Sequence, residues 1–270
     1  MNNNMKISII GGGNMGGAIV RGLVKGSIFK PEDIFVSDVN QDILDTLKKD
    51  IPGLNVELDS YSSVSSADIV FVAVKPWLVE NVIERIKFKM NYERQIFVSI
   101  AGGVDIETLC KYLEKHSDET SLPVIFRVIP NTAIAVRKSV NLISTENASD
   151  EQRDLILRIF NELGTTILLD ESKLDAGTAL TSCGIAYLFR YVRAATSAGI
   201  EMGLYPKEAQ NMIIETMLGA AELLKANGTN PESEIDKVTT PGGITIKGLN
   251  EMEANGFSNA VIKGIKASKR

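Results

Sequence analysis

Three regularly spaced glycines follow the first apolar segment of the chain. Residues 7–10 are Ile-Ser-Ile-Ile, and Gly11, Gly13 and Gly16 come next in a G-x-G-x-x-G pattern. From Ala18 the chain continues with apolar residues at helical spacing. A buried strand, a glycine turn and a helix in this order are typical of a turn that binds the pyrophosphate of a dinucleotide.

Each glycine has a physical role in that interpretation. Gly11 permits the tight turn out of the strand, Gly13 leaves room for a pyrophosphate beside the backbone, and Gly16 lets the helix pack closely on the strand. The start of the helix adds unpaired N–H groups and the positive end of its dipole, which both favour an anion. The alternative is a glycine-rich turn that binds no ligand.

An acidic residue closes the second expected strand, which covers residues 34–37. Asp38 stands where a carboxylate can accept hydrogen bonds from a ribose 2′-hydroxyl and repel a 2′-phosphate. No arginine or lysine that could bind the 2′-phosphate occurs between Ser37 and Thr46. The segment therefore favours NADH over NADPH, and the use of either cofactor is kept as a possibility. Asp38 has a second interpretation, as the cap of a helix that begins at Gln41, and one residue can serve both roles.

Small or polar residues also follow later strands, where ligands bind in open α/β sheets. They are Lys75-Pro76 after the strand 68–74, Ala101-Gly-Gly103 after the strand 95–100, and Asn131-Thr132 after the strand 124–128. Pro76 forces Lys75 out of helical geometry and can begin the next helix. Lys75 then has two interpretations, as a ligand-binding residue or as an ordinary loop lysine. The polar pair Asn131-Thr132 either hydrogen-bonds a ligand amide or makes a turn.

Composition excludes several classes of protein. The chain has 270 residues, of which 44% are hydrophobic and 23% are charged, so it can bury a full core. A net charge of −5 gives nucleic acid no electrostatic support, and no apolar run approaches the roughly 20 residues that span a bilayer. Cys110 and Cys183 form no disulfide or metal motif, which fits a reducing cytoplasm and predicts no metal. His116 lies in a polar stretch and is expected at the surface rather than as a catalytic base.

The order of the expected elements divides the chain in two. Over residues 1–168, strands and helices alternate, which predicts an α/β domain with a Rossmann-type, doubly wound sheet. Over residues 169–270 the strand-like runs stop, and the pattern predicts helices over 174–202, over 206–226 and from 245 to the C-terminus. Helices with so small a core of their own are expected to pack against a second subunit.

Four motifs occur in order along the chain. They are the glycine loop through Met15 and Ala18, Ala73-Val-Lys-Pro76, Arg127-Val-Ile-Pro-Asn-Thr132, and Asp236-Lys-Val-Thr-Thr-Pro-Gly-Gly-Ile-Thr-Ile-Lys-Gly-Leu249. In sequence and spacing they resemble the pyrroline-5-carboxylate reductase family over nearly the whole chain. The resemblance implies reduction of the cyclic imine 1-pyrroline-5-carboxylate to proline, the last step of proline biosynthesis, with NADPH or NADH.

The resemblance also implies a fold and a set of site residues. The fold is a Rossmann domain followed by an all-α dimerisation domain that interlocks in a homodimer, and several members assemble further into decamers. The implied cofactor-binding residues are Gly11, Gly13, Asn14, Met15, Gly16, Asp38, Ala73, Val74, Lys75, Pro76 and Asn131. The substrate carboxylate is placed on the loop from Thr240 to Thr245, where the amides of Ile244 and Thr245 receive it beside Gly243. The hydroxyl of Thr240 assists and that of Thr245 faces the ring nitrogen, so these two threonines are the implied catalytic residues.

One segment departs from the family pattern. Members usually carry Ala-Leu-Ser-Gly-Ser-Gly-Pro-Ala-Tyr, whereas residues 179–187 here are Ala-Leu-Thr-Ser-Cys-Gly-Ile-Ala-Tyr. Ser182 adds bulk and Ile185 removes a proline break, which leaves the substrate range open, and Cys183 is interpreted as a small buried residue. Two other functions are kept as alternatives. One is a hydroxyacid dehydrogenase of similar build, against which it counts that such enzymes use a lysine in this helix and residues 174–203 contain none. The other is a noncatalytic nucleotide-binding protein, which only the altered segment supports.

Overall fold

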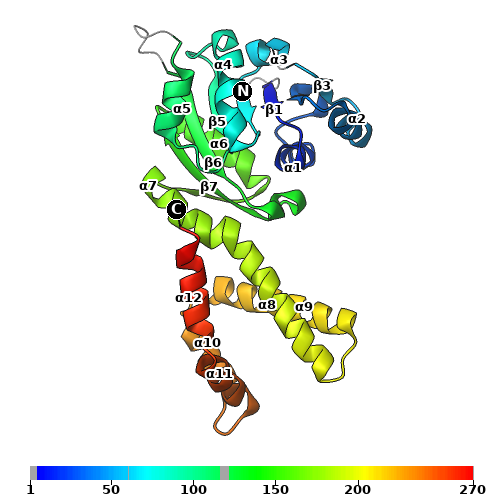
Figure 1. Ribbon diagram of the computed structural model, residues 1–270, viewed down its shortest axis with the longest axis vertical. Coiled ribbons are helices and arrows are strands. Elements are labelled where there is room, and N and C mark those ends of the chain that lie inside the picture. Colours follow the sequence, from blue (N-terminus) through cyan, green and yellow to red (C-terminus); the bar gives the residue numbers. More distant parts are fainter. Residues whose placement is uncertain (1–4, 60, 116–121, 270) are drawn as a thin grey trace. The chain divides into compact units, whose positions relative to one another are not determined.

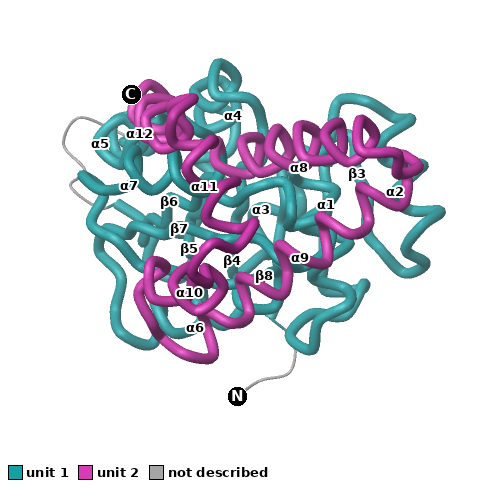
Figure 2. The backbone as a smooth tube through the Cα atoms, turned by 90° about the horizontal axis from the view of Figure 1, so that it is seen from below, with its two compact units in different colours: residues 1–182 teal, residues 183–270 magenta. Residues whose placement is uncertain are grey.

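The computed structural model describes residues 5–59, 61–115 and 122–269, which form two compact units. The first unit extends to residue 182 and the second begins at residue 183, and each is described by itself (Figure 2, teal and magenta). The first unit ends later in the chain than the expected boundary at residue 168. Helix α7 (Glu171–Thr178) accounts for the difference, because its Leu174 is buried against Ile129 and Leu142 of the sheet.

An eight-stranded sheet forms the centre of the first unit (Figure 1). The strands lie in the order β3-β2-β1-β4-β5-β6-β7-β8, and β1 to β6 run parallel. Strand β7 is antiparallel to β6 and pairs in parallel with β8. The strands are β1 Ile7–Ile10, β2 Ile34–Ser37, β3 Asn55–Glu57, β4 Ile69–Val72, β5 Ile96–Ser99, β6 Val124–Ile129, β7 Ser139–Glu146 and β8 Gly164–Leu168. The expected Rossmann-type sheet is confirmed.

Both faces of the sheet are buried under helices, as continuous apolar strands require. In β4, Ile69 and Phe71 point into one core cluster and Val70 and Val72 into the other, because side chains alternate along a strand. Helices α1, α2 and α6 supply side chains to the first cluster, and α3, α4 and α5 to the second. Their bounds are α1 Asn14–Leu23, α2 Gln41–Asp50, α3 Tyr61–Ser66, α4 Val79–Ile86, α5 Ile106–Leu113 and α6 Asp150–Asn161.

The described part of the second unit is helical. Its helices are α8 Gly184–Glu201, α9 Pro206–Asn227, α10 Pro231–Val238, α11 Ile244–Ala254 and α12 Phe257–Ala267. Few of its described side chains are buried within the chain: Thr196, Gly199 and Ala209 are the buried positions of α8 and α9, and α10 to α12 bury none. An all-α second part is confirmed, and its apolar surface is left for another protein chain to cover.

One expectation about these helices was wrong and another was confirmed. The helix expected from residue 245 to the C-terminus is two helices, because Gly256 adopts the left-handed conformation, with φ 79°, between α11 and α12. The short helix α10 was not expected. The long helix expected over 174–202 is confirmed, because the backbone is helical without a break from residue 171 to residue 201 and a π-helical turn at Ala179–Cys183 joins α7 to α8.

Candidate active site

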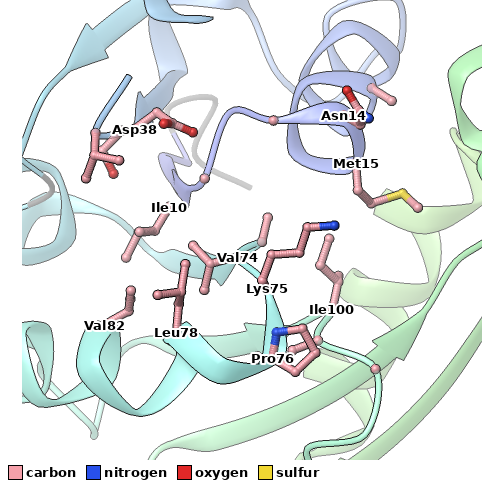
Figure 3. A pocket seen from close by; sticks show the side chains of 18 of the residues that line it. Ile10, Asn14, Met15, Asp38, Val74, Lys75, Pro76, Leu78, Val82 and Ile100 are labelled. Atoms are coloured by element: carbon pink, nitrogen blue, oxygen red, sulfur yellow. The ribbon is translucent and has the colours of Figure 1, made fainter. Parts of the chain in front are cut away.

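A cleft of about 1130 Å³ runs along the carboxyl edge of the sheet in the first unit (Figure 3). Its walls come from the segments that follow β1 to β6, where ligands bind in open α/β sheets. Nine of the expected cofactor-binding residues line it: Gly11, Gly13, Asn14, Met15, Asp38, Ala73, Val74, Lys75 and Pro76. The predicted site is thus assembled from segments that are far apart in sequence.

The glycine loop forms the turn that its spacing predicted. Gly11 has φ 104°, which suits a glycine, and its N–H donates to the carbonyl of Ser37 at 2.7 Å. A Cβ atom on Gly16 would lie 1.9 Å from the carbonyl oxygen of Gly11, so only glycine lets α1 start so close to the strand. A Cβ atom on Gly13 would meet nothing within 4 Å, which leaves open space beside the backbone.

The open N-terminus of α1 borders the same space. Gly13 is its N-cap residue and offers no side-chain hydrogen bond to the first turn, whose N–H groups have no partner inside a helix. Gly13, Asn14 and Met15 all line the cleft. Unpaired N–H groups and the positive end of the helix dipole make this a place where a pyrophosphate fits.

Asp38 follows β2 and lines one end of the cleft. Its Oδ2 accepts a hydrogen bond from Gly12 N at 2.8 Å, and its Oδ1 accepts one from Asn40 N at 2.9 Å. The interpretation of Asp38 as the cap of α2 is wrong, because Asn40 is the N-cap residue and accepts from Asp42 N at 2.9 Å. The Asp38 carboxylate therefore supports the glycine loop while it faces the cleft.

Lys75 and Pro76 follow β4 at the middle of the cleft. Lys75 has φ −62° and ψ 147°, an extended conformation that Pro76 imposes, and Pro76 begins the 3₁₀ helix Pro76–Leu78 as expected. The exposed side chain of Lys75 extends on the side of the cleft where Met15 lies (Figure 3). An ammonium group here can attract the negatively charged part of a ligand.

Two of the expected cofactor-binding residues do not line the cleft. Gly16 lies inside α1, where it contacts the backbone of Gly11. Asn131 is 7% exposed; its Oδ1 accepts from Ala133 N at 3.1 Å and its Nδ2 donates to the carbonyl of Thr181 at 3.4 Å. The turn interpretation of Asn131 describes this geometry, and its neighbour Thr132 lines the cleft instead.

Some cleft residues were not found from the sequence. Val39, Leu58 and Asp59 follow β2 and β3, and Asn81, Val82 and Arg85 come from α4. Asn81 and Arg85 are exposed and lie away from the buried positions of α4, so helical periodicity could have separated them, whereas Val82 packs partly against the core. That this face meets a cleft is a consequence of the tertiary fold.

The loop before α11 carries the expected substrate-binding residues of the second unit. Gly243 N donates to the carbonyl of Thr240 at 2.9 Å, and Gly242 turns the chain with φ 71°. Gly243 is the N-cap residue of α11 and gives no side-chain hydrogen bond to the first turn, which begins with Ile244 and Thr245. Ile244 is 87% exposed, so this helix N-terminus is accessible within the unit.

His116 lies outside the described residues. Cys183 is half-buried, which is less than expected. It is a free cysteine. No group of three or more side chains suited to a metal occurs among the residues that the structure describes. None of the helices in the described ranges is both long and apolar enough to cross a membrane.

The parallel sheet, the glycine turn and the open N-terminus of α1 define a dinucleotide-binding protein of the Rossmann class. A family model described as "NADP oxidoreductase coenzyme F420-dependent" matches residues 6–103, and one described as "Pyrroline-5-carboxylate reductase dimerisation" matches residues 171–270. The pyrroline-5-carboxylate reductase of Methanosarcina acetivorans is 34% identical, over 98% of this chain and 97% of its own length. Reductase 1 of Dictyostelium discoideum is 39% identical, and this chain spans about half of it, 48%.

Solved structures agree with these relatives. The reductase of Coxiella burnetii has a TM-score of 0.88 and 28% identity, covering 98% of this chain and 96% of its own. The reductase of Plasmodium falciparum, solved with NADP bound, has a TM-score of 0.87 and 26% identity, covering 99% of this chain and 97% of its own. The chain belongs to the pyrroline-5-carboxylate reductase family, and the resemblance of its four motifs is confirmed.

Proposed function

We propose that this chain reduces 1-pyrroline-5-carboxylate to L-proline with NADPH or NADH, as an oxidoreductase that acts on a C=N bond in proline biosynthesis. The observation that carries the proposal is the glycine turn with open space at Gly13, in a chain that belongs to the pyrroline-5-carboxylate reductase family. Within the first unit the cleft suits the cofactor, and within the second unit the loop before α11 suits the substrate.

The residues of the cleft suit the cofactor. The N–H groups at the start of α1 would hold its pyrophosphate beside Gly13, and Asp38 would accept from a ribose hydroxyl. Lys75 and Pro76 would border the cofactor from the end of β4. The bound reduced nicotinamide supplies the hydride, and the protein supplies binding, orientation and electrostatics.

The loop before α11 suits a small carboxylic acid. Its helix N-terminus offers the N–H groups of Ile244 and Thr245 beside Gly243, and a carboxylate is the kind of anion that such a terminus binds. The hydroxyl of Thr240 would assist, and that of Thr245 would hydrogen-bond the ring nitrogen. A protonated imine is already electrophilic, so the site needs to hold and orient the substrate rather than supply a strong acid. Holding two reactants in place can contribute roughly 7–11 kcal/mol to the barrier reduction.

The second unit supports assembly into a homodimer. Exposed apolar side chains are frequent on its helices, among them Phe189 on α8 at 62% and Leu218 on α9 at 55%. A soluble protein rarely leaves such surface uncovered, and the dimerisation family model covers this region. We also propose a further assembly of dimers into a decamer and a location in the reducing cytoplasm, where two free cysteines persist.

The test is a steady-state assay of NADH or NADPH oxidation that depends on 1-pyrroline-5-carboxylate, with proline identified by chromatography. The informative variant is Thr245→Val, which keeps the size and branching of the side chain and removes one hydroxyl. Loss of a hydrogen bond to a charged group costs about 1.5–3 kcal/mol, so kcat/KM for the substrate is expected to fall about 10- to 150-fold while cofactor affinity is kept. An inactive wild-type protein would refute the proposal, and wild-type kinetics in Thr245→Val would remove this threonine from the site.

A further inference from the structure

Three cationic side chains line the cleft among its described residues, Arg21, Lys75 and Arg85. Arg21 is already bound, because its Nε and Nη2 donate to Asp50 Oδ2 at 3.2 Å and 2.9 Å. Lys75 stands at the end of β4, on the side where Met15 lies (Figure 3). The role of Arg85, which comes from α4, is not explained by the glycine turn or by the motifs of the family.

Two observations place Arg85 at the end of the cleft where Asp38 lies. Helix α4 leads away from Pro76, so that Leu78 and then Val82 lie progressively nearer the Asp38 end (Figure 3), and Arg85 follows Val82 by about one turn on the same face. Arg85 Nη2 also lies 3.7 Å from Asp59 Oδ1, and Asp59 comes just after β3, the neighbour of β2. Arg85 and Asp38 therefore reach the cleft from opposite walls of one end.

The contact between Arg85 and Asp59 is loose. Their side chains are 60% and 57% exposed, and an exposed ion pair at 3.7 Å contributes little to stability. A guanidinium in this setting can turn toward a better partner at small cost. A phosphate group is such a partner, because its oxygens match the fork of N–H donors and it carries more charge than a carboxylate.

We propose that Arg85 receives the 2′-phosphate of NADP at this end of the cleft and so opposes the selection that Asp38 exerts for a free 2′-hydroxyl. This inference rests on the proposed dinucleotide site and adds a specificity-determining residue to it. Asp38 repels the phosphate from the β2 side, and Arg85 attracts it from α4. The two effects act in opposite directions, so the protein discriminates only modestly between the two cofactors.

The experiment is calorimetric titration of the full chain with NADP⁺ and with NAD⁺, which differ only in the 2′-phosphate. In Arg85→Gln, NADP⁺ affinity is expected to fall about five- to tenfold, the size of one partly exposed charged contact, while NAD⁺ affinity changes by less than about twofold. Arg85→Lys keeps the charge and is expected to retain most of the NADP⁺ affinity. Arg153→Gln is the matched control, because Arg153 forms an exposed ion pair with Asp150 on α6 and does not line the cleft.

The dependence on salt gives a second measurement. In Arg85→Gln only the repulsion by Asp38 remains, so raising the ionic strength is expected to raise the ratio of NADP⁺ to NAD⁺ affinity; in the wild type the two opposing effects are screened together, and the ratio is expected to change less. If Arg85→Gln lowers the affinity for both nucleotides equally, then Arg85 packs on the adenine. If it leaves both affinities unchanged, then Arg85 does not contact the 2′ position. Either result overturns the inference. A wild-type protein that binds neither nucleotide would overturn the proposed function as well.

Discussion

Gly13 and Gly16 lie one turn apart, yet a side chain would meet different surroundings at each. A Cβ atom at Gly13 enters open space, whereas at Gly16 it would lie 1.9 Å from the carbonyl oxygen of Gly11. Gly13→Val is therefore expected to fold normally and to lose cofactor binding, because the valine fills the space that the pyrophosphate needs. Calorimetric titration measures the binding, and the melting temperature checks the fold.

Gly16→Ala is the control for that substitution. It places a methyl group against backbone that cannot move away cheaply, so it is expected to lower the melting temperature even without cofactor. A folded Gly13→Val protein with unchanged cofactor affinity would show that the glycine turn binds no pyrophosphate.

The charge of Asp38 is expected to disfavour NADPH, in opposition to Arg85. Two unit charges about 4 Å apart near a protein surface interact by roughly 4 kcal/mol, and a quarter of that remaining after solvent screening is about a fivefold penalty on NADPH. Asp38→Ser is expected to raise the ratio of kcat/KM for NADPH to that for NADH. Asp38→Asn is the variant closest in size, because its one oxygen can still accept from Gly12 N while the charge and the acceptor for Asn40 N are removed. A ratio that neither variant changes would leave Asp38 as a support of the glycine loop alone.

The same residues show how far single positions can be predicted. Gly11, Asp38 and Lys75 were found because each follows a strongly apolar strand, and strand ends of a parallel sheet meet at one edge. Asn131 also follows a strand, but its side chain turns back to cap the next 3₁₀ helix, a choice that the local sequence left open. Arg85 was missed because its place in the cleft depends on how α4 crosses the sheet edge, which no local pattern records.

At the scale of elements, buried strands and capped helices were the most predictable. Residues 34–37 form β2 as expected, and the capping box at Ser149 is present, with Gln152 Oε1 accepting from Ser149 N at 2.9 Å. The apolar spacing of α11 continues into α12, so periodicity alone did not reveal the break that Gly256 makes. Helix α10 is short and polar, and its start depends on a local hydrogen bond from Glu232 N to the Asn230 side chain.

The turn from α9 into α10 depends on one carboxylate. Asn227 Nδ2 donates to Glu234 Oε1 at 3.1 Å and Lys237 Nζ does so at 2.7 Å, and the hydroxyl of Thr229 donates as well. These donors, Lys237 first, lower the pKa of Glu234 to about 2 from an ordinary value of 4.5. Because the folded pKa is the lower one, the ionised carboxylate stabilises the fold above pH 4.5, and this contribution is lost as the pH falls from 4.5 towards 2.

Glu234→Gln is accordingly expected to melt below the wild type at pH 6 and to approach it as the pH falls below 4.5. Melting temperatures of both proteins across this range measure the effect. In a Lys237→Gln background the same substitution should cost less at pH 6, because the largest cause of the pKa shift is gone. A difference in melting temperature that stays constant from pH 6 to pH 3 would contradict this role of the carboxylate.

At the scale of the whole molecule, the two units differ in how they are stabilised. The first buries two large apolar clusters against its sheet, whereas the described helices of the second bury almost nothing within the chain. Helices derive most of their stability from the packing of an apolar face, so the second unit needs a further chain to cover that face. The membership of this region in a dimerisation family agrees with that requirement.

Phe189→Glu on α8 is the substitution that tests this dependence. In a two-fold symmetric dimer the substitution is present in both subunits. Each copy removes about 1.5–3 kcal/mol of stabilisation by apolar burial and places a charge in the interface, which weakens association further. We expect the wild type to sediment as a multiple of the 29.3 kDa chain, and the variant to dissociate at micromolar concentration and to melt at a lower temperature. Phe88→Glu in the first unit is the matched control, since that phenylalanine is 57% exposed against 62% for Phe189, and it is expected to leave the mass unchanged. A wild type that sediments as a single chain, or a Phe189→Glu protein with an unchanged mass, would mean that the exposed face of α8 is not the subunit interface.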